Sequence, residues 1–283
     1  MRQFILENKQ IKNGLVIIDG KDFRYLRQVL RVRPGDMINV RLSDGSLNNA
    51  TVALVDDKNR SVTLQLCAST DSAKSTKSIT RGVQAAEIEE AVSAAVTEYW
   101  LFQFLPRAQK FELIVRQATE CGVSVIVPVI GEYTEKSSVA AMQGAKRERL
   151  DRIIKEARQQ SGSPVDTKVL EPMALEEAMK LWKPESEPLE GKEAVAFVLS
   201  ERDDCDGNLR NAVEKAASKS EIKKAAIAVG SEGGISPAEV TFLQEKGLFL
   251  PIHFAVNILR CETAALYGIA AVQNEINQSQ VGK

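Results

Sequence analysis

Three glycines surround a serine and a glutamate in the stretch AAIAVGSEGGISPAEV, residues 225–240. Glycine costs backbone entropy, so Gly230, Gly233 and Gly234 indicate either unusual backbone dihedral angles or the close approach of another group. The chain contains neither GxGxxG nor GxxxxGK(S/T), which argues against a loop that holds a pyrophosphate or triphosphate. Glu232 also disfavours a phosphate. The stretch therefore predicts a site for a neutral or cationic ligand, with a purely structural turn as the alternative.

A second junction of the same kind follows in FAVNILRCETAALYG, residues 254–268: a short apolar run, a loop and an Ala-rich helix. Arg260, Glu262 and Thr263 lie where this loop meets the helix, where a glutamate is favourable and a threonine can cap. A capped helix with a neighbouring ion pair would explain these residues without a ligand. Two such loops at adjacent strand ends nevertheless predict one shared pocket, because ligands of open parallel sheets bind beyond the carboxyl ends of strands.

Strands and helices alternate from about residue 98 onward, and these elements are expected to position both loops. Ser236, Pro237 and Glu239 predict a capped helix that begins directly after the glycine loop. The alternation of uniformly apolar strands with helices predicts a mainly parallel α/β sheet covered on both faces. The expected strands are 98–105, 123–130, 194–200 and 225–230, and the expected helices are 108–121, 146–160, 208–218 and 261–276.

The first seventy residues have a different pattern. Short β-like runs separated by turn signals predict a small β-barrel over 1–70, with the runs at 3–6, 14–19, 37–42, 50–57 and 61–68. A Ser/Thr/Lys-rich linker is expected over 71–82. The second domain, 83–283, then opens with an Ala/Glu-rich segment, 83–97, that is compatible with a helix.

One helical segment, 21–33, interrupts the barrel strands and carries a local charge signal. At 100° per residue, Arg24, Arg27 and Arg31 fall on one stripe, while apolar residues that include Val29 point toward the core. Three guanidinium groups on one face beside a small barrel suit the phosphates of a nucleic-acid backbone. The alternative is an ordinary solvated helix face.

Composition limits the other classes of function. The 283 residues have a formal net charge of −1, which gives no overall signal for nucleic acid. His253 is the only histidine and the four cysteines have no metal-ligand spacing, so we expect no metal, a structural histidine and reduced thiols. No apolar run is long enough to span a membrane and no signal peptide is evident, so a cytoplasmic protein is expected.

Both loop motifs together resemble a known family. VGSEGGISPAEV followed by NILRCETAALYGIAAV is similar to the paired C-terminal motifs of the SPOUT-superfamily RNA methyltransferases, specifically the family that methylates uridine N3 in 16S ribosomal RNA. Further matching stretches occur in the family's order at 25–36, 110–129 and 156–163. The resemblance therefore covers most of the chain.

The resemblance implies a fold and a set of partners. It implies an N-terminal PUA-like β-barrel that binds RNA and a C-terminal SPOUT α/β domain with a deep trefoil knot. It also implies S-adenosyl-L-methionine held in the knot, 16S rRNA of the small ribosomal subunit as substrate, and a homodimer with its interface beside the cofactor. Another RNA such as tRNA, or a non-catalytic RNA- or ribosome-binding module, are the alternatives.

The resemblance also assigns roles to residues. Arg260 is expected to stabilise developing charge on uracil, and Glu232 and Glu262 are candidate bases, although both can be structural. Lys110 joins Arg24, Arg27 and Arg31 as expected RNA contacts. The residues expected to bind the cofactor are Val229, Gly230, Ser231, Glu232, Gly233, Gly234, Ile258, Leu259 and Thr263.

Several residues depart from the family pattern. Ser231 replaces a proline in the glycine loop, so the turn is expected to be less rigid. Ala255 and Asn257 replace a glycine and an arginine, and Ser163 stands where the family has an arginine. The last change puts the contacts with RNA in question.

Overall fold

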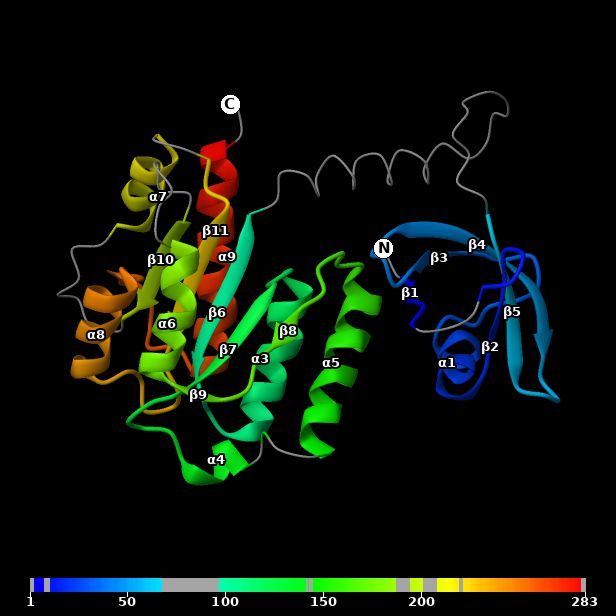
Figure 1. The fold of residues 1–283 in the computed structure, drawn as a ribbon, viewed down its shortest axis with the longest axis horizontal. Coiled ribbons are helices and arrows are strands. Elements are labelled where there is room, and N and C mark those ends of the chain that lie inside the picture. The colour runs from blue at the N-terminus through cyan, green and yellow to red at the C-terminus, as the bar shows by residue number, and fades with distance from the viewer. Residues whose placement is uncertain are drawn as a thin grey trace. The chain divides into compact units, whose positions relative to one another are not determined.

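The computed structural model describes residues 3–7, 11–67, 97–140, 142, 145–186, 194–200, 208–218 and 221–280. The chain divides into two compact units (Figure 1): Met1–Ala94 with Gln159–Gly162, and Ala95–Arg158 with Ser163–Lys283. The expected linker, 71–82, lies outside the described residues, as does the expected helix of 83–97 except for its last residue.

The first unit contains a curled sheet in the order β1-β3-β4-β5-β2. β1 pairs with β3 in parallel, and the other neighbours are antiparallel. A bulge in β4 between Val52 and Leu54 helps the sheet to bend. All five predicted runs form strands here: β1 (Phe4–Ile5), β2 (Leu15–Ile18), β3 (Met37–Arg41), β4 (Leu47–Asp56) and β5 (Ser61–Leu66).

The helix predicted over 21–33 is wrong in length and type. α1 covers Gly20–Arg24 and a π-helical turn continues over Tyr25–Val29. Arg31 lies beyond both, with a left-handed φ of 55°. Because the π turn changes the angle per residue and the helix ends before Arg31, the three arginines do not form one helical stripe. Val29, which we expected to face the core, is exposed.

The second unit is built on a parallel sheet in the order β12-β10-β11-β6-β7-β8, with β9 also paired to β7. β11 lies inside the sheet between β10 and β6, so the glycine loop leaves from the interior rather than from an edge. The strands are β6 (Glu98–Phe104), β7 (Val125–Ile130), β8 (Lys168–Val169), β9 (Met173–Ala174), β10 (Ala194–Leu199), β11 (Lys224–Val229) and β12 (Leu250–Ile252).

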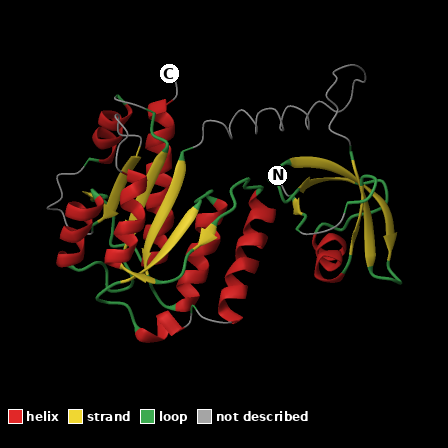
Figure 2. Cartoon of the chain, in the orientation of Figure 1, coloured by secondary structure: helices red, strands yellow, loops and turns green. Residues whose placement is uncertain are grey.

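Helices cover both faces of this sheet, which confirms the predicted α/β class (Figure 2). One face packs against α3 (Ala108–Glu120), α5 (Ala145–Ser161), α7 (Leu209–Ala217) and α9 (Cys261–Gln280). The other packs against α6 (Leu175–Ser186) and α8 (Pro237–Gly247). A short α4 (Lys136–Ala140) follows β7. On the second face, aromatic rings form a connected cluster of Trp100, Phe102, Trp182 and Phe249.

The second loop differs from its prediction in two ways. The apolar run that begins at Phe254 is not a strand, because β12 ends at Ile252, which pairs with Leu199 at the end of β10. In addition, β10 lies between β11 and β12, so the two loops do not leave adjacent strands. The end of β10 therefore lies between them.

Two further expectations concern the whole chain. The trefoil knot implied by the resemblance stays a prediction, because strand order and pairing do not describe how the chain threads. Within the described ranges, no helix has both the length and the apolar character needed to cross a lipid bilayer.

Candidate functional site

The glycine loop is a tight turn at the end of β11. The Gly234 amide donates to the Ser231 carbonyl at 3.1 Å, and the Gly233 amide donates to Ser231 Oγ at 3.3 Å. Gly234 has a φ of 80°, a left-handed conformation that favours glycine. Ser231 therefore stabilises the turn through its side chain at the position where the family has a proline.

The other two glycines are required by packing within the protein. A Cβ on Gly230 would lie 2.7 Å from the carbonyl carbon of Gly234, and one on Gly233 would lie 2.7 Å from Cβ of Tyr133. We expected these glycines to admit a ligand. The close approach described here is to the loop's own backbone and to the loop that follows β7, and contact with a ligand stays a prediction.

Gln103 holds the base of the glycine loop and was missed in the sequence. This fully buried side chain on β6 donates from Nε2 to the carbonyls of Val229 and Gly230 at 3.2 and 3.0 Å. A third acceptor is the carbonyl of Phe104 at 2.9 Å. The available signal was a glutamine among the hydrophobic residues that follow Glu98 in β6.

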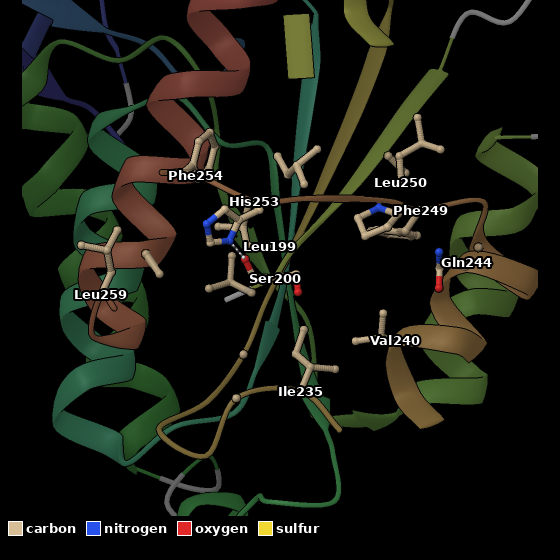
Figure 3. Close-up of a pocket in the computed structure, with 18 of the residues that line it drawn as sticks. Leu199, Ser200, Ile235, Val240, Gln244, Phe249, Leu250, His253, Phe254 and Leu259 are labelled. Atoms are coloured by element: carbon tan, nitrogen blue, oxygen red, sulfur yellow. Dashed lines mark hydrogen bonds between the residues drawn. The ribbon is translucent and has the colours of Figure 1, made fainter. Parts of the chain in front are cut away.

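The loop of residues 253–260 forms the second wall. Figure 3 shows His253 at its start, where Nδ1 lies 3.1 Å from the Ser200 carbonyl at the end of β10. This contact agrees with the structural role expected for the histidine. Figure 3 also shows Phe254 and Leu259 near α9, whereas Val240 and Gln244 of α8 lie on the opposite side. The 253–260 loop on one side and α8 on the other thus enclose the carboxyl end of β10.

Both loops converge on one pocket of about 1460 Å³. This volume exceeds the range of typical small-molecule sites, roughly 300–1,000 Å³. Of the residues predicted from the sequence for catalysis or cofactor binding, Gly233, Glu262 and Thr263 are not among those that line it. The predicted residues that do line it are Lys110, Val229, Gly230, Ser231, Glu232, Gly234, Ile258, Leu259 and Arg260.

Lys110 brings the two candidate bases together. Its Nζ lies 3.5 Å from Glu232 Oε1 and 3.6 Å from Glu262 Oε2. The backbone amide of Arg107 also donates to Glu232 Oε1 at 3.3 Å. The ion pair that the ligand-free explanation of this junction required therefore exists, and its cation is Lys110 of α3.

The titration of this cluster has clear physical causes. Burial alone would raise the pKa of Glu262, but hydrogen bonds from its own amide and from Cys261, together with Lys110, lower that pKa overall. Burial and the hydrogen bond to Glu262 raise the pKa of the Cys261 thiol to about 12. Glu262 is therefore ionised and Cys261 protonated at neutral pH. A lowered pKa makes Glu262 a weak proton acceptor.

Arg260 is exposed beside the pocket. Its guanidinium makes no hydrogen bond or ion pair with the part of the chain that the structure describes. A cation of this kind next to a pocket is available to an anionic or carbonyl-bearing substrate.

The arginines of the first unit differ from one another. Arg27 makes a bidentate pair with Asp57 at 3.1 and 3.0 Å and also donates to the Val32 carbonyl. Arg24 and Arg31 are exposed and have no such partner among the described residues. Two of the three predicted guanidinium groups are therefore available to a ligand, whereas Arg27 is committed to the protein.

Ser163 is buried, and its Oγ accepts from the Val165 amide at 3.3 Å. This residue therefore belongs to the packing of the second unit. Arg158 nearby is also buried and pairs with Asp166.

The donors and apolar groups of the pocket fit S-adenosylmethionine. The backbone groups of Asn257, Ile258 and Leu259 make no hydrogen bond with any described residue, so they can bind the edge of a purine. Leu199 and Ile235 add apolar surface to the lining. Carboxylates beside the pocket suit a cationic sulfonium and an ammonium group.

Two family models match the chain. One, described as an RNA methyltransferase domain, covers residues 92–273. The other, described as an RNA methyltransferase PUA domain, covers residues 18–67. Together they match both units and leave only short segments uncovered.

Individual relatives agree with these models. "Ribosomal RNA small subunit methyltransferase E" of Aquifex aeolicus is 32% identical over 163 residues, which are 58% of this chain and 62% of that protein. "Ribosomal RNA small subunit methyltransferase E 2" of Borreliella burgdorferi is 24% identical over 279 residues, 95% of this chain and 96% of that protein. The structure of a ribosomal RNA small subunit methyltransferase E from Neisseria gonorrhoeae bound to S-adenosyl methionine is 25% identical, covers 97% of both chains and superposes with a TM-score of 0.67.

Proposed function

This chain belongs to the RNA methyltransferase family, and from that premise we propose that it transfers a methyl group from S-adenosylmethionine to N3 of a uridine in 16S ribosomal RNA. The observation that carries the proposal is the convergence of the glycine loop and the 253–260 loop on one pocket. The names of the Aquifex and Borreliella relatives and the ligand of the Neisseria structure support the substrate and the cofactor.

S-adenosylmethionine would supply an activated methyl group when bound. The chain's own residues would bind and orient it. Gln103 fixes the carbonyls at the base of the glycine loop, and the unpaired backbone of residues 257–259 would hold the adenine. Because positioning alone can contribute a large part of a rate enhancement, these contacts are the main catalytic contribution that we propose for the loops.

The uracil must leave its base pair to expose N3, and it must lose a proton. We assign Arg260 to stabilise the negative charge that develops on the uracil carbonyls or to hold a neighbouring phosphate. Glu262 is a weak candidate for the base because its pKa is lowered. Glu232, the more exposed of the two carboxylates, is the better candidate.

A homodimer forms part of the proposal. Exposed apolar side chains gather on the second loop and α9: Val256, Ile258 with 83% of its surface exposed, and Tyr267. Such a group next to a pocket suits a partner surface. Light scattering at several protein concentrations tests for the dimer. The proposed substrate would put the protein with ribosomal subunits in the cytoplasm.

The test is turnover of S-adenosylmethionine on small ribosomal subunits that lack the modification, read by mass spectrometry of the rRNA. Arg260→Ala is expected to lower turnover by about 100-fold or more, the usual loss for one charge-stabilising group, while cofactor affinity stays within about threefold. Methylation of a tRNA pool instead would indicate another RNA substrate. Failure of the wild-type protein to bind the cofactor would overturn the proposal.

A further inference from the structure

Lys110 lies between two carboxylates that come from different elements beside the pocket. Glu232 belongs to the glycine loop and Glu262 to the first turn of α9, and the ammonium group is 3.5 and 3.6 Å from them. The side chain of Lys110 is 27% exposed and that of Glu262 is 17% exposed. A partly buried pair is screened less by salt than a surface pair.

We propose that Lys110 is a positioning residue that clamps the two pocket loops together, in place of the RNA contact expected from the sequence. Its base is rigid, because the next turns of α3 bury Phe111, Ile114 and Val115 in the core. A fixed cation between the glycine loop and the first turn of α9, which directly follows the 253–260 loop, sets the distance between their carboxylates. The effect on cofactor binding rests on the proposed function.

Removal of the ammonium group would leave two negative charges directed at the same point. Like charges at short distance repel, and the repulsion is stronger near a protein surface than in bulk water. Among the described residues no other basic side chain pairs with either carboxylate. The loops would therefore separate, and the unpaired backbone groups of residues 257–259 would lose their fixed position.

Arg107 provides a matched control. It lies three residues before Lys110 at the start of α3, but its guanidinium is exposed and pairs with Glu135, at 2.8 Å. Its hydrogen bond to Glu232 comes from the backbone amide, which a substitution retains, and the charge interaction of its guanidinium with Glu232 is minor beside that with Glu135. Both residues are cations on the same segment, and only Lys110 bridges the loops.

Isothermal titration with S-adenosylmethionine in the absence of RNA tests the clamp. Lys110→Met is expected to weaken binding at least fivefold, about the effect of one lost ion pair, whereas Arg107→Met and Lys110→Arg stay within about twofold of wild type. In the Lys110→Met background, Glu262→Gln is expected to restore part of the affinity, because it removes the repulsion. Wild-type affinity in Lys110→Met, or equal losses in Lys110→Met and Arg107→Met, would overturn the proposal.

Hydrogen exchange of the ligand-free protein tests the clamp without any cofactor. We expect faster exchange in Lys110→Met than in Arg107→Met at residues 230–234 and 257–263, with unchanged exchange in α3. Equal exchange in the two variants would refute the clamp. If the wild-type protein binds no S-adenosylmethionine but exchange still depends on Lys110, the clamp stands and the proposed function fails.

Discussion

Gly230 is the glycine whose size matters most to the pocket. It lines the pocket, and an added methyl group would meet the backbone of Gly234, which cannot move as a flexible side chain could. We therefore expect Gly230→Ala to weaken S-adenosylmethionine binding by about tenfold or more, or about 1.4 kcal/mol. Isothermal titration measures the affinity.

Ser231→Ala is the control for this change. It removes only the hydroxyl group that accepts from the Gly233 amide, which corresponds to about 0.5–1.5 kcal/mol of stability. Cofactor affinity should change less than in Gly230→Ala. Similar affinities in both variants would show that the fit of Gly230 against Gly234 does not govern the pocket.

Glu262 is expected to make the free energy of unfolding depend on pH in the acid range. Its folded-state pKa lies below the ordinary value of about 4.3, so the ionised form is favoured in the folded protein. The resulting stability is present above that ordinary value and is lost as the pH falls through the lowered pKa. In urea titrations between about pH 6 and pH 3, we expect the difference in free energy of unfolding between wild type and Glu262→Gln to shrink with acid. A constant difference would contradict this assignment.

At the scale of elements, Glu239 connects α8 to the loop that follows β7. Its Oε2 accepts from the Ser236 amide at 2.9 Å and completes the capping box, while its Oε1 accepts from the Glu132 amide at 2.7 Å. One carboxylate therefore starts the helix after the glycine loop and holds a second loop beside it. This loop carries Tyr133, which packs on Gly233.

Two substitutions separate these roles. Ser236→Ala should cost about 1 kcal/mol, the usual value of a lost N-cap. Glu239→Ala should cost about 2–3 kcal/mol, because two amides lose their acceptor. Urea denaturation measures both free energies of unfolding. Equal costs would mean that the contact with Glu132 contributes nothing.

The sequence was sufficient for elements with strong local signals. Largely apolar runs identified β6, β7, β10 and β11, and the motif at Ser236 identified α8. The two-residue strands β8 and β9 carry no period that could reveal them. The π-helical turn at Tyr25–Val29 was not predicted, because its angle per residue differs from the 100° of an α-helix.

The candidate site was only partly accessible to the same reasoning. Spacing and the family resemblance located both loops, and most of the residues predicted to bind the cofactor line the pocket. The clamp did not, because Lys110, Glu232 and Glu262 lie far apart in the sequence and meet only through the packing of α3 and α9. Gln103 was missed because an isolated polar residue in a strand does not reveal which carbonyls it binds.

At the scale of the whole molecule, the first unit is expected to bind RNA and the second to bind the cofactor. Arg24 and Arg31 are the predicted RNA contacts without a partner among the described residues, so their joint reversal to glutamate should reduce RNA affinity. The slope of log affinity against log salt should fall by about one for each lost phosphate contact. Filter binding at several salt concentrations measures both.

Arg210→Glu is the control for net charge, since Arg210 is an exposed arginine of α7 that pairs with Glu214. S-adenosylmethionine affinity should be unchanged by either alteration. An equal loss of RNA affinity in the control, per charge reversed, would show that overall charge rather than the first unit governs RNA binding.

The position of β11 inside the sheet has a consequence for synthesis on the ribosome. β6 can pair with β7 soon after both strands emerge from the ribosome. Its other neighbour is β11, and Gln103 of β6 can donate to the Val229 carbonyl only after 126 further residues have been synthesised. At about 5–20 residues per second, this delay lasts roughly 6–25 seconds. During that time one edge of β6 is exposed in the nascent chain. A product truncated before Val229 is therefore expected to aggregate or be degraded, because its β6 lacks the neighbouring strand that covers this edge.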